Sequence, residues 1–243
     1  MTPTLSTPAL VLHTTQYAET SIIAKLFARQ LGVRSYIIKG VRKSGSRAKQ
    51  NLFQPLSYLD MVVYDNPKSN LNYIKEAALH RGAVTGHTLQ DVAVANALRF
   101  FMTELLYKAL PEAEPMPELF DEVTRELDTI DESGTAVSHR PILFLLCLSR
   151  HLGIAPWDNY SLREPLFNLE AGRFQFAAGG TLERADSLLL HHYLLAVHND
   201  GQPPVTTLGQ RTRLIDSLVE YYQLHLAGFS HFSSHEILHS ILQ

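Results

Sequence analysis

The feature that most constrains this chain is a change of pattern near residue 80. Before it, short runs of β-branched and aromatic residues alternate with turn-forming residues. After it, long apolar stretches follow helical spacing. Strands followed by helices are typical of an α+β fold or of two separate domains. We therefore expect a strand-rich domain over residues 1–80 and a helical domain over residues 81–243.

Five segments of the first domain are candidate strands. Four have clear strand character, namely residues 9–15, 33–40, 55–64 and 71–79. The fifth, residues 21–31, is ambiguous, because its apolar residues fit helical spacing slightly better while its short connections favour a strand. Five short strands with no long helix predict a small barrel of the OB-fold or SH3-like type.

The second domain is predicted to consist of helices with one interruption. Capping and stop signals place the helices at about 89–110, 117–130, 139–152, 182–198, 207–226 and 234 to the end. Residues 153–180 break the pattern, and residues 165–176 within them predict a β-hairpin that turns at Glu170, Ala171 and Gly172. The single cysteine, Cys147, lies in the most apolar helix and is expected to be a small core residue. One cysteine excludes a disulfide within the chain and fits a reducing, cytoplasmic setting.

Charge divides at the same place as the pattern. Residues 1–80 hold ten Lys and Arg against four Asp and Glu, a net charge of +6, and residues 81–243 hold eleven against twenty, a net charge of −9. Between Thr20 and Leu59 there are eight basic residues and no acidic one. Such an asymmetry suggests that the two domains have different partners.

The most informative local feature is the expected loop over residues 40–51, which combines glycine and serine with four cations. Flexible cations of this kind can follow a phosphodiester backbone. Nearby tyrosine and phenylalanine side chains offer stacking surfaces for unpaired bases. The alternative is a solvated loop without a partner, but a basic run this long favours nucleic acid. The predicted DNA-binding residues are Lys25, Arg34, Tyr36, Lys39, Arg42, Lys43, Arg47 and Lys49, with Phe53 and Tyr58 as further stacking candidates.

One catalytic motif is present, His235-Glu236-Ile237-Leu238-His239, which matches the zinc-protease pattern H-E-x-x-H. No ligand-type residue follows it, and upstream histidines such as His225 or His231 have no supporting pattern. Ser233 and Glu236 also match a helix capping box, which explains the same residues without a metal. A zinc hydrolase is therefore a minor alternative, and we expect no bound zinc, no catalytic residue and no cofactor. The sequence lacks P-loop, Rossmann and α/β-hydrolase motifs and any apolar run of 18 residues or more.

Over residues 9–80 the sequence resembles the RecO family, bacterial mediators of DNA repair and recombination. The resemblance rests on a Y-x-E-T-S run, a following segment that ends in K-G-x-R, and a Q-P strand that ends in tyrosine. The matching positions are Tyr17, Glu19, Thr20, Ser21, Leu26, Phe27, Gly32, Lys39, Gly40, Arg42, Gln54, Pro55 and Tyr64. Further along, Leu152, Gly153 and Pro156 stand where the family has an L-G-x-x-P segment.

The resemblance implies an OB-fold followed by a helical domain, which favours a strand over residues 21–31. It also implies a non-catalytic, cytoplasmic and nucleoid-associated protein with no membrane partner. Such a protein binds single- and double-stranded DNA, anneals complementary strands, pairs with RecR, contacts the tail of the single-stranded-DNA-binding protein SSB, and helps load RecA. Arg150, Arg211 and Arg213 are weak candidates for the SSB contact, with surface ion pairs as the alternative. A protein-interaction adaptor without DNA binding is the other alternative.

The sequence departs from the family at one point. Many members carry a four-cysteine zinc module after the L-G-x-x-P segment, whereas this chain has Trp157 to Ser161 and then the predicted hairpin, with no cysteine. We expect the apolar side chains of Phe167, Leu169, Phe174 and Phe176 to stabilise the hairpin in place of a metal.

Overall fold

The structure is a computed structural model that describes residues 4–41, 47–64, 71–80, 89–132, 138–176, 179–199 and 201–241. Contacts divide the chain into two compact units, the first formed by Met1–His87 and Thr103–Glu132, the second by Thr88–Met102 and Ser133–Gln243. Residues 103–132, which the sequence pattern groups with the other helices, therefore pack in one unit with the strands. Helix α2 (Leu89–Ala109) contributes to both units.

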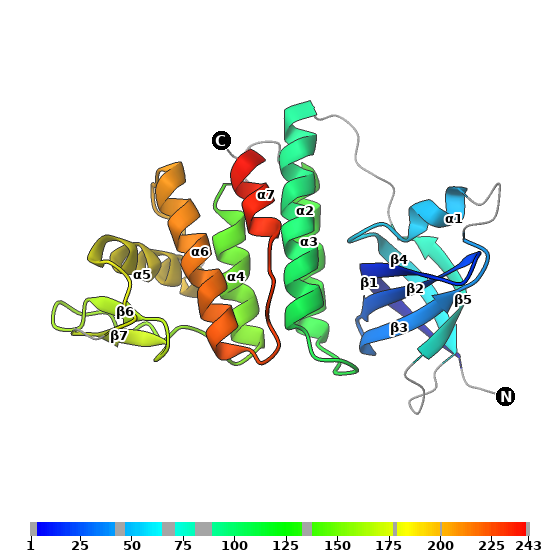
Figure 1. The fold of residues 1–243 in the computed structure, drawn as a ribbon, viewed down its shortest axis with the longest axis horizontal. Coiled ribbons are helices and arrows are strands. Elements are labelled where there is room, and N and C mark those ends of the chain that lie inside the picture. Colours follow the sequence, from blue (N-terminus) through cyan, green and yellow to red (C-terminus); the bar gives the residue numbers. More distant parts are fainter. Residues whose placement is uncertain are drawn as a thin grey trace. The chain divides into compact units, whose positions relative to one another are not determined.

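The first unit contains a closed five-stranded barrel (Figure 1). Its strands are β1 (Thr4–Tyr17), β2 (Ser21–Ala28), β3 (Gly32–Ile38), β4 (Tyr58–Tyr64) and β5 (Leu71–Leu79), in the order β1-β2-β3-β5-β4. Strands β3 and β5 pair in parallel, and the other neighbouring strands pair in antiparallel fashion. A five-stranded barrel of this kind, followed by helices, confirms the predicted OB-like α+β fold.

Residues 21–28, which the pattern leaves ambiguous, form the strand β2. This strand pairs with β1 on one side and β3 on the other. Ala24, Leu26 and Ala28 alternate along it and lie fully buried in the barrel core. Pairing on both sides satisfies the backbone amides, so the tertiary context decides against the helix that local spacing favours.

The expected loop over residues 40–51 is partly helical. Helix α1 (Arg47–Leu52) occupies its second half, between β3 and β4. The loop prediction is therefore wrong for this part, because the chain is helical from Arg47 onward. Residues 42–46 lie outside the described residues.

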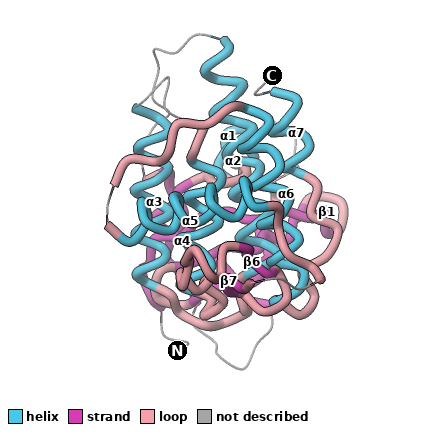
Figure 2. Tube along the Cα trace, turned by 90° about the vertical axis from the view of Figure 1, so that its left-hand side faces the viewer, coloured by secondary structure: helices cyan, strands magenta, loops and turns pink. Residues whose placement is uncertain are grey.

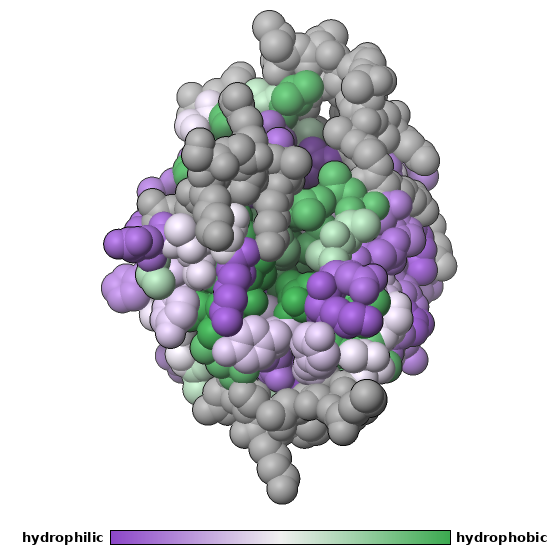
Figure 3. Space-filling model, turned by 90° about the vertical axis from the view of Figure 1, so that its right-hand side faces the viewer, coloured by the Kyte–Doolittle hydropathy of each residue, from purple (hydrophilic) through white to green (hydrophobic). Residues whose placement is uncertain are grey.

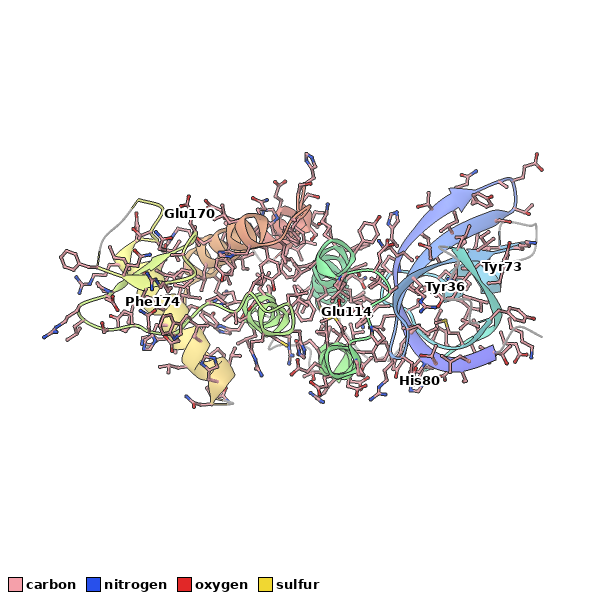
Figure 4. The ribbon with its side chains drawn as sticks, turned by 90° about the horizontal axis from the view of Figure 1, so that it is seen from below. Tyr36, Tyr73, His80, Glu114, Glu170 and Phe174 are labelled. Carbon is pink, nitrogen blue, oxygen red and sulfur yellow. The ribbon has the colours of Figure 1, made fainter. Side chains whose placement is uncertain are left out.

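Helix α3 (Pro117–Glu132) and the segment before it pack on the barrel within the first unit. Phe120 meets Phe27 edge to face, with ring centroids 5.4 Å apart, and the backbone amide of Ala113 donates to the carbonyl of Val33 at 2.9 Å. Gly32 allows this approach, because a Cβ built there would lie 2.2 Å from the carbonyl oxygen of Glu114. The φ of Gly32 is +68°, a conformation that also favours glycine. Figure 4 shows Glu114 in the segment beside the barrel.

The second unit is built on α4 (Arg140–His151), α5 (Arg184–His198), α6 (Leu208–His225) and α7 (Ser234–Ile241) (Figure 2). Buried tyrosines of α6 tie it to its neighbours: Tyr222 donates to the carbonyl of Leu145, and Tyr221 to that of Ile154, both at 2.7 Å. Cys147 of α4 is half-buried. Among the described residues, no helix is long and apolar enough to cross a membrane.

The predicted hairpin is present as β6 (Leu166–Asn168) and β7 (Arg173–Gln175). Phe167 and Phe174 are fully buried and meet edge to face, and Leu169 is nearly buried. Phe176 was expected to join them, but its side chain is 79% exposed, since β7 ends at Gln175. Three of the four apolar side chains therefore stabilise the hairpin.

Candidate nucleic-acid interface

An open groove of about 370 Å³ lies on the barrel surface between α1 and the strands β3, β4 and β5. This volume falls at the lower end of the range of ligand pockets, about 300–1,000 Å³. Its wall is mostly apolar, with charged residues at its border: Ile37, Ile38, Lys39, Leu52, Phe53, Tyr64, Tyr73, Ile74, Lys75, Glu76 and Ala77. Figure 3 shows this side of the barrel, with hydrophobic residues at its centre and hydrophilic residues around them.

Aromatic and cationic groups meet in the groove. The ammonium of Lys39 lies over the ring of Tyr73, 5.5 Å from its centroid. Tyr73 is 46% exposed and Tyr64 is 39% exposed, so both rings are accessible from solvent beside the apolar wall. Lys75 stands on the same strand and pairs with Glu76 at 3.5 Å. An exposed ring with a cation beside it can stack on a base while the cation meets the adjoining phosphate.

Five of the predicted DNA-binding cations belong to residues 39–49, between Lys39, which lines the groove, and the end of α1. Lys39 follows β3 and is exposed. Arg47 and Lys49 lie in α1, where only the backbone is described. Arg42 and Lys43 lie outside the described residues. Of these cations, Lys39 is the one that lines the groove among the residues whose side chains are described.

Lys25 and Arg29 lie elsewhere on the barrel and already have acidic partners. The ammonium of Lys25 is 2.8 Å from the Glu112 carboxylate and 5.0 Å from the ring centroid of Tyr107. The Arg29 guanidinium donates two hydrogen bonds to Asp121, of 2.7 and 2.8 Å. This pairing raises the pKa of Arg29 and lowers the pKa of Asp121. Lys25 is therefore engaged within the first unit.

Two of the remaining first-unit candidates, Tyr36 and Phe53, are buried, and the other two, Arg34 and Tyr58, are half-buried. Tyr36 is fully buried in the barrel core, so its ring cannot offer a surface to a base without unfolding the barrel (Figure 4). Phe53 is 4% exposed, and Tyr58 stacks on His80 with ring centroids 4.1 Å apart. The stacking role expected for Tyr36 and Phe53 does not fit these positions. Arg34 is half-buried on β3.

The three arginines considered for a protein partner differ in their surroundings. Arg213 makes two hydrogen bonds to the Asp186 carboxylate, of 3.0 and 2.9 Å, and this pairing raises its pKa. Arg211 donates to the carbonyl and hydroxyl oxygens of Thr206. Arg150 is exposed on α4. The alternative of a surface ion pair describes Arg213, which is also exposed, whereas no ion pair to Arg150 is among the contacts described.

Sequence reasoning missed Tyr64, Tyr73 and Lys75. A signal was present, since residues of β5 alternate: Asn72 is buried while Tyr73 and Lys75 are exposed. Period-two alternation assigns these two residues to one face of a strand. Only the barrel, however, places that face beside α1 and the end of β3.

Comparisons with known proteins agree over the whole chain. The family descriptions "Recombination protein O N terminal" and "Recombination protein O C terminal" match residues 1–83 and 91–162. The chain is 29% identical to DNA repair protein RecO of Christiangramia forsetii over 243 residues, covering 98% of both chains. It is also 29% identical to that of Phocaeicola vulgatus over 238 residues, covering 96% of both chains. The chain therefore belongs to the RecO family of DNA repair proteins.

Proposed function

We propose that this protein is a recombination mediator that binds single- and double-stranded DNA through its barrel, anneals complementary strands and, with RecR, assists RecA loading on SSB-coated DNA. The observation that carries the proposal is the groove beside α1, where Lys39 lies over the exposed ring of Tyr73. Four further basic residues follow Lys39 in the sequence up to Lys49. The relatives are named DNA repair proteins, which supports the same function.

The mechanism is physical and involves no covalent step. Cations of the segment 39–49 neutralise phosphates and release condensed counterions, which supplies affinity without sequence preference. The exposed ring of Tyr73 offers a stacking surface to an unpaired base. Two strands held on basic surfaces repel each other less, and this lowers the electrostatic barrier to annealing.

Salt-dependent binding of a labelled single-stranded oligonucleotide tests the proposal. The logarithm of the affinity should fall linearly with the logarithm of the salt concentration, by about 0.7 for each phosphate neutralised. The triple variant Arg42→Ala/Lys43→Ala/Arg47→Ala should lower the magnitude of this slope by about 2 and weaken binding at low salt. The matched control, Arg163→Ala/Arg173→Ala/Arg184→Ala, removes the same charge from the second unit and should leave the slope unchanged.

Two results would overturn the proposal. Absence of oligonucleotide binding at low salt would favour the adaptor alternative. An equal loss of slope in the triple variant and its control would show that net charge, and not the segment beside the groove, governs binding.

The second unit is proposed to contact protein partners. The acidic excess of residues 81–243 does not lie in this unit, since residues 103–132, with a net charge of −8, belong to the first unit. Residues 88–102 and 133–243 hold eight Lys and Arg against ten Asp and Glu, a net charge of −2.

An acidic SSB tail requires a local cation, and Arg150 is exposed on α4. Arg150→Ala should weaken binding of a labelled SSB tail peptide in a polarisation assay, whereas Arg213→Ala should not, because Asp186 already engages Arg213. Equal effects of both variants would remove Arg150 from the proposed site.

A further inference from the structure

The H-E-x-x-H motif of the C-terminal helix has a feature that the DNA-binding function does not use. His235 and His239 are four residues apart on α7 and therefore share a face of the helix. The sequence offers no third ligand after them. The structure supplies an acidic group from another helix of the same unit, Asp216 of α6.

Both imidazoles face one oxygen of this carboxylate. The Nε2 atoms of His235 and His239 lie 3.9 and 3.7 Å from Oδ1 of Asp216. These separations exceed an N–H···O hydrogen bond, about 2.7–3.2 Å. Each is shorter than the summed length of a Zn–N and a Zn–O bond, about 4.0–4.4 Å. The three donor atoms are not all within 4.8 Å of one another, so the side chains must move before one ion can contact all three.

The histidine nitrogens also lack hydrogen-bond partners. Nε2 of His239 and Nδ1 of His235 are buried and make no hydrogen bond. An unpaired buried polar atom costs free energy, and such an atom in a native fold calls for an explanation. A cation between Nε2 of His239 and Asp216 would supply the missing partner.

The surroundings hold the two rings but leave a path for an ion. Phe232 stacks on His235 with ring centroids 5.4 Å apart, and the histidine side chains are mostly buried. The Asp216 side chain is 50% exposed and opens the cluster to solvent. The imidazoles meet edge to face at 5.7 Å, so rotation of one ring is needed for both to reach one ion.

We propose that His235, His239 and Asp216 bind one divalent cation of the Zn²⁺ type and that this ion joins α7 to α6. Two imidazoles and a carboxylate suit Zn²⁺, Co²⁺ or Ni²⁺ better than Mg²⁺ or Ca²⁺, which prefer oxygen ligands alone. Water completes the coordination. The proposed site binds a metal and has no catalytic role. It differs from the expectation from sequence that no zinc is bound. The proposal does not depend on the DNA-binding proposal.

Calorimetric titration of the chelator-treated full chain with Zn²⁺ tests the site. We expect one ion more per wild-type chain than per Asp216→Asn or His239→Ala chain, or an affinity at least about tenfold higher. Zn²⁺ should also raise the thermal midpoint of the wild type, because the ion binds only the folded site, and this rise should be lost in both variants. His192→Ala, at an exposed histidine of α5, is the matched control and should behave as wild type.

The Asp216→Asn variant keeps the proposal testable if His239→Ala does not fold, since Asp216 lies at the surface. The proposal fails if Zn²⁺ binds Asp216→Asn with wild-type stoichiometry and affinity. It also fails if the wild type binds no more Zn²⁺ than the His235→Ala/His239→Ala variant. Oligonucleotide binding by these variants should be unchanged.

Discussion

The two ends of the basic run between Thr20 and Leu59 have different surroundings in this protein. Lys25 and Arg29 face acidic side chains of the 103–132 segment and form ion pairs with Glu112 and Asp121. Lys39, farther along the run, stands over Tyr73 at the border of an open groove. In the sequence these cations look alike, because no acidic residue lies between Thr20 and Leu59.

The difference shows that charge in a sequence does not identify a binding surface. A cation already paired inside its own unit must break that pair before it can meet a phosphate. The acidic partners of Lys25 and Arg29 come from residues 112 and 121, remote in sequence. We therefore expect one end of the run to serve stability and the other to serve DNA binding.

The largest expected effect is at the paired end, where Gly32 lets the 112–114 segment approach. Gly32→Ala places a methyl group against the Glu114 carbonyl at a positive φ and should cost about 3 kcal/mol of unfolding free energy. Chemical denaturation measures this cost. Gly153→Ala is the matched control: its φ is +70° but nothing lies within 4 Å, so we expect a loss of only about 1 kcal/mol. Equal losses would show that the close approach to Glu114 has no energetic role.

At the groove end, Tyr73→Ala should weaken single-stranded DNA binding by about 1–3 kcal/mol, the usual worth of stacking on one base. Tyr73→Phe keeps the ring and should bind as wild type. Fluorescence anisotropy with a short oligonucleotide measures both. Equal affinities of Tyr73→Ala and wild type would leave the groove without a stacking role.

A pair of single substitutions compares the two ends directly. Lys39→Gln should lower the magnitude of the salt slope of DNA binding by about 0.7. Lys25→Gln removes the same charge but should leave the slope unchanged and slightly lower the midpoint, because Glu112 loses its partner. If Lys25→Gln also lowers the magnitude of the salt slope of DNA binding, then both Lys25 and Lys39 contact DNA.

The smallest effect concerns pH. Arg29 lowers the pKa of Asp121 below the usual value of about 3.9, so the pair stabilises the fold above that value. This contribution is lost as the pH falls through the depressed pKa. Asp121→Asn should therefore lower the thermal midpoint slightly at pH 7 and approach the wild-type midpoint near pH 3. A difference that stays constant with pH would argue against the ion pair.

Much of the fold followed from pattern. The alternation in residues 55–64 and 71–79 predicts β4 and β5, and Pro117 with its acidic first turn predicts the start of α3. The helix over residues 47–52 escaped prediction, because its six residues are too few to show a helical period. The exposure of Phe176 was also not predicted, because nothing in the local sequence distinguishes Phe176 from the buried Phe174.

By itself, the sequence determined the α+β class, the uneven distribution of charge along the chain and the family, because each depends on local periodicity, composition or matching motifs. Only the tertiary structure decided that Tyr36 is core, that Tyr73 borders a groove, and that Asp216 faces His235 and His239. The physical reason is that exposure and ion pairing depend on neighbours distant in the chain, which local sequence patterns do not specify.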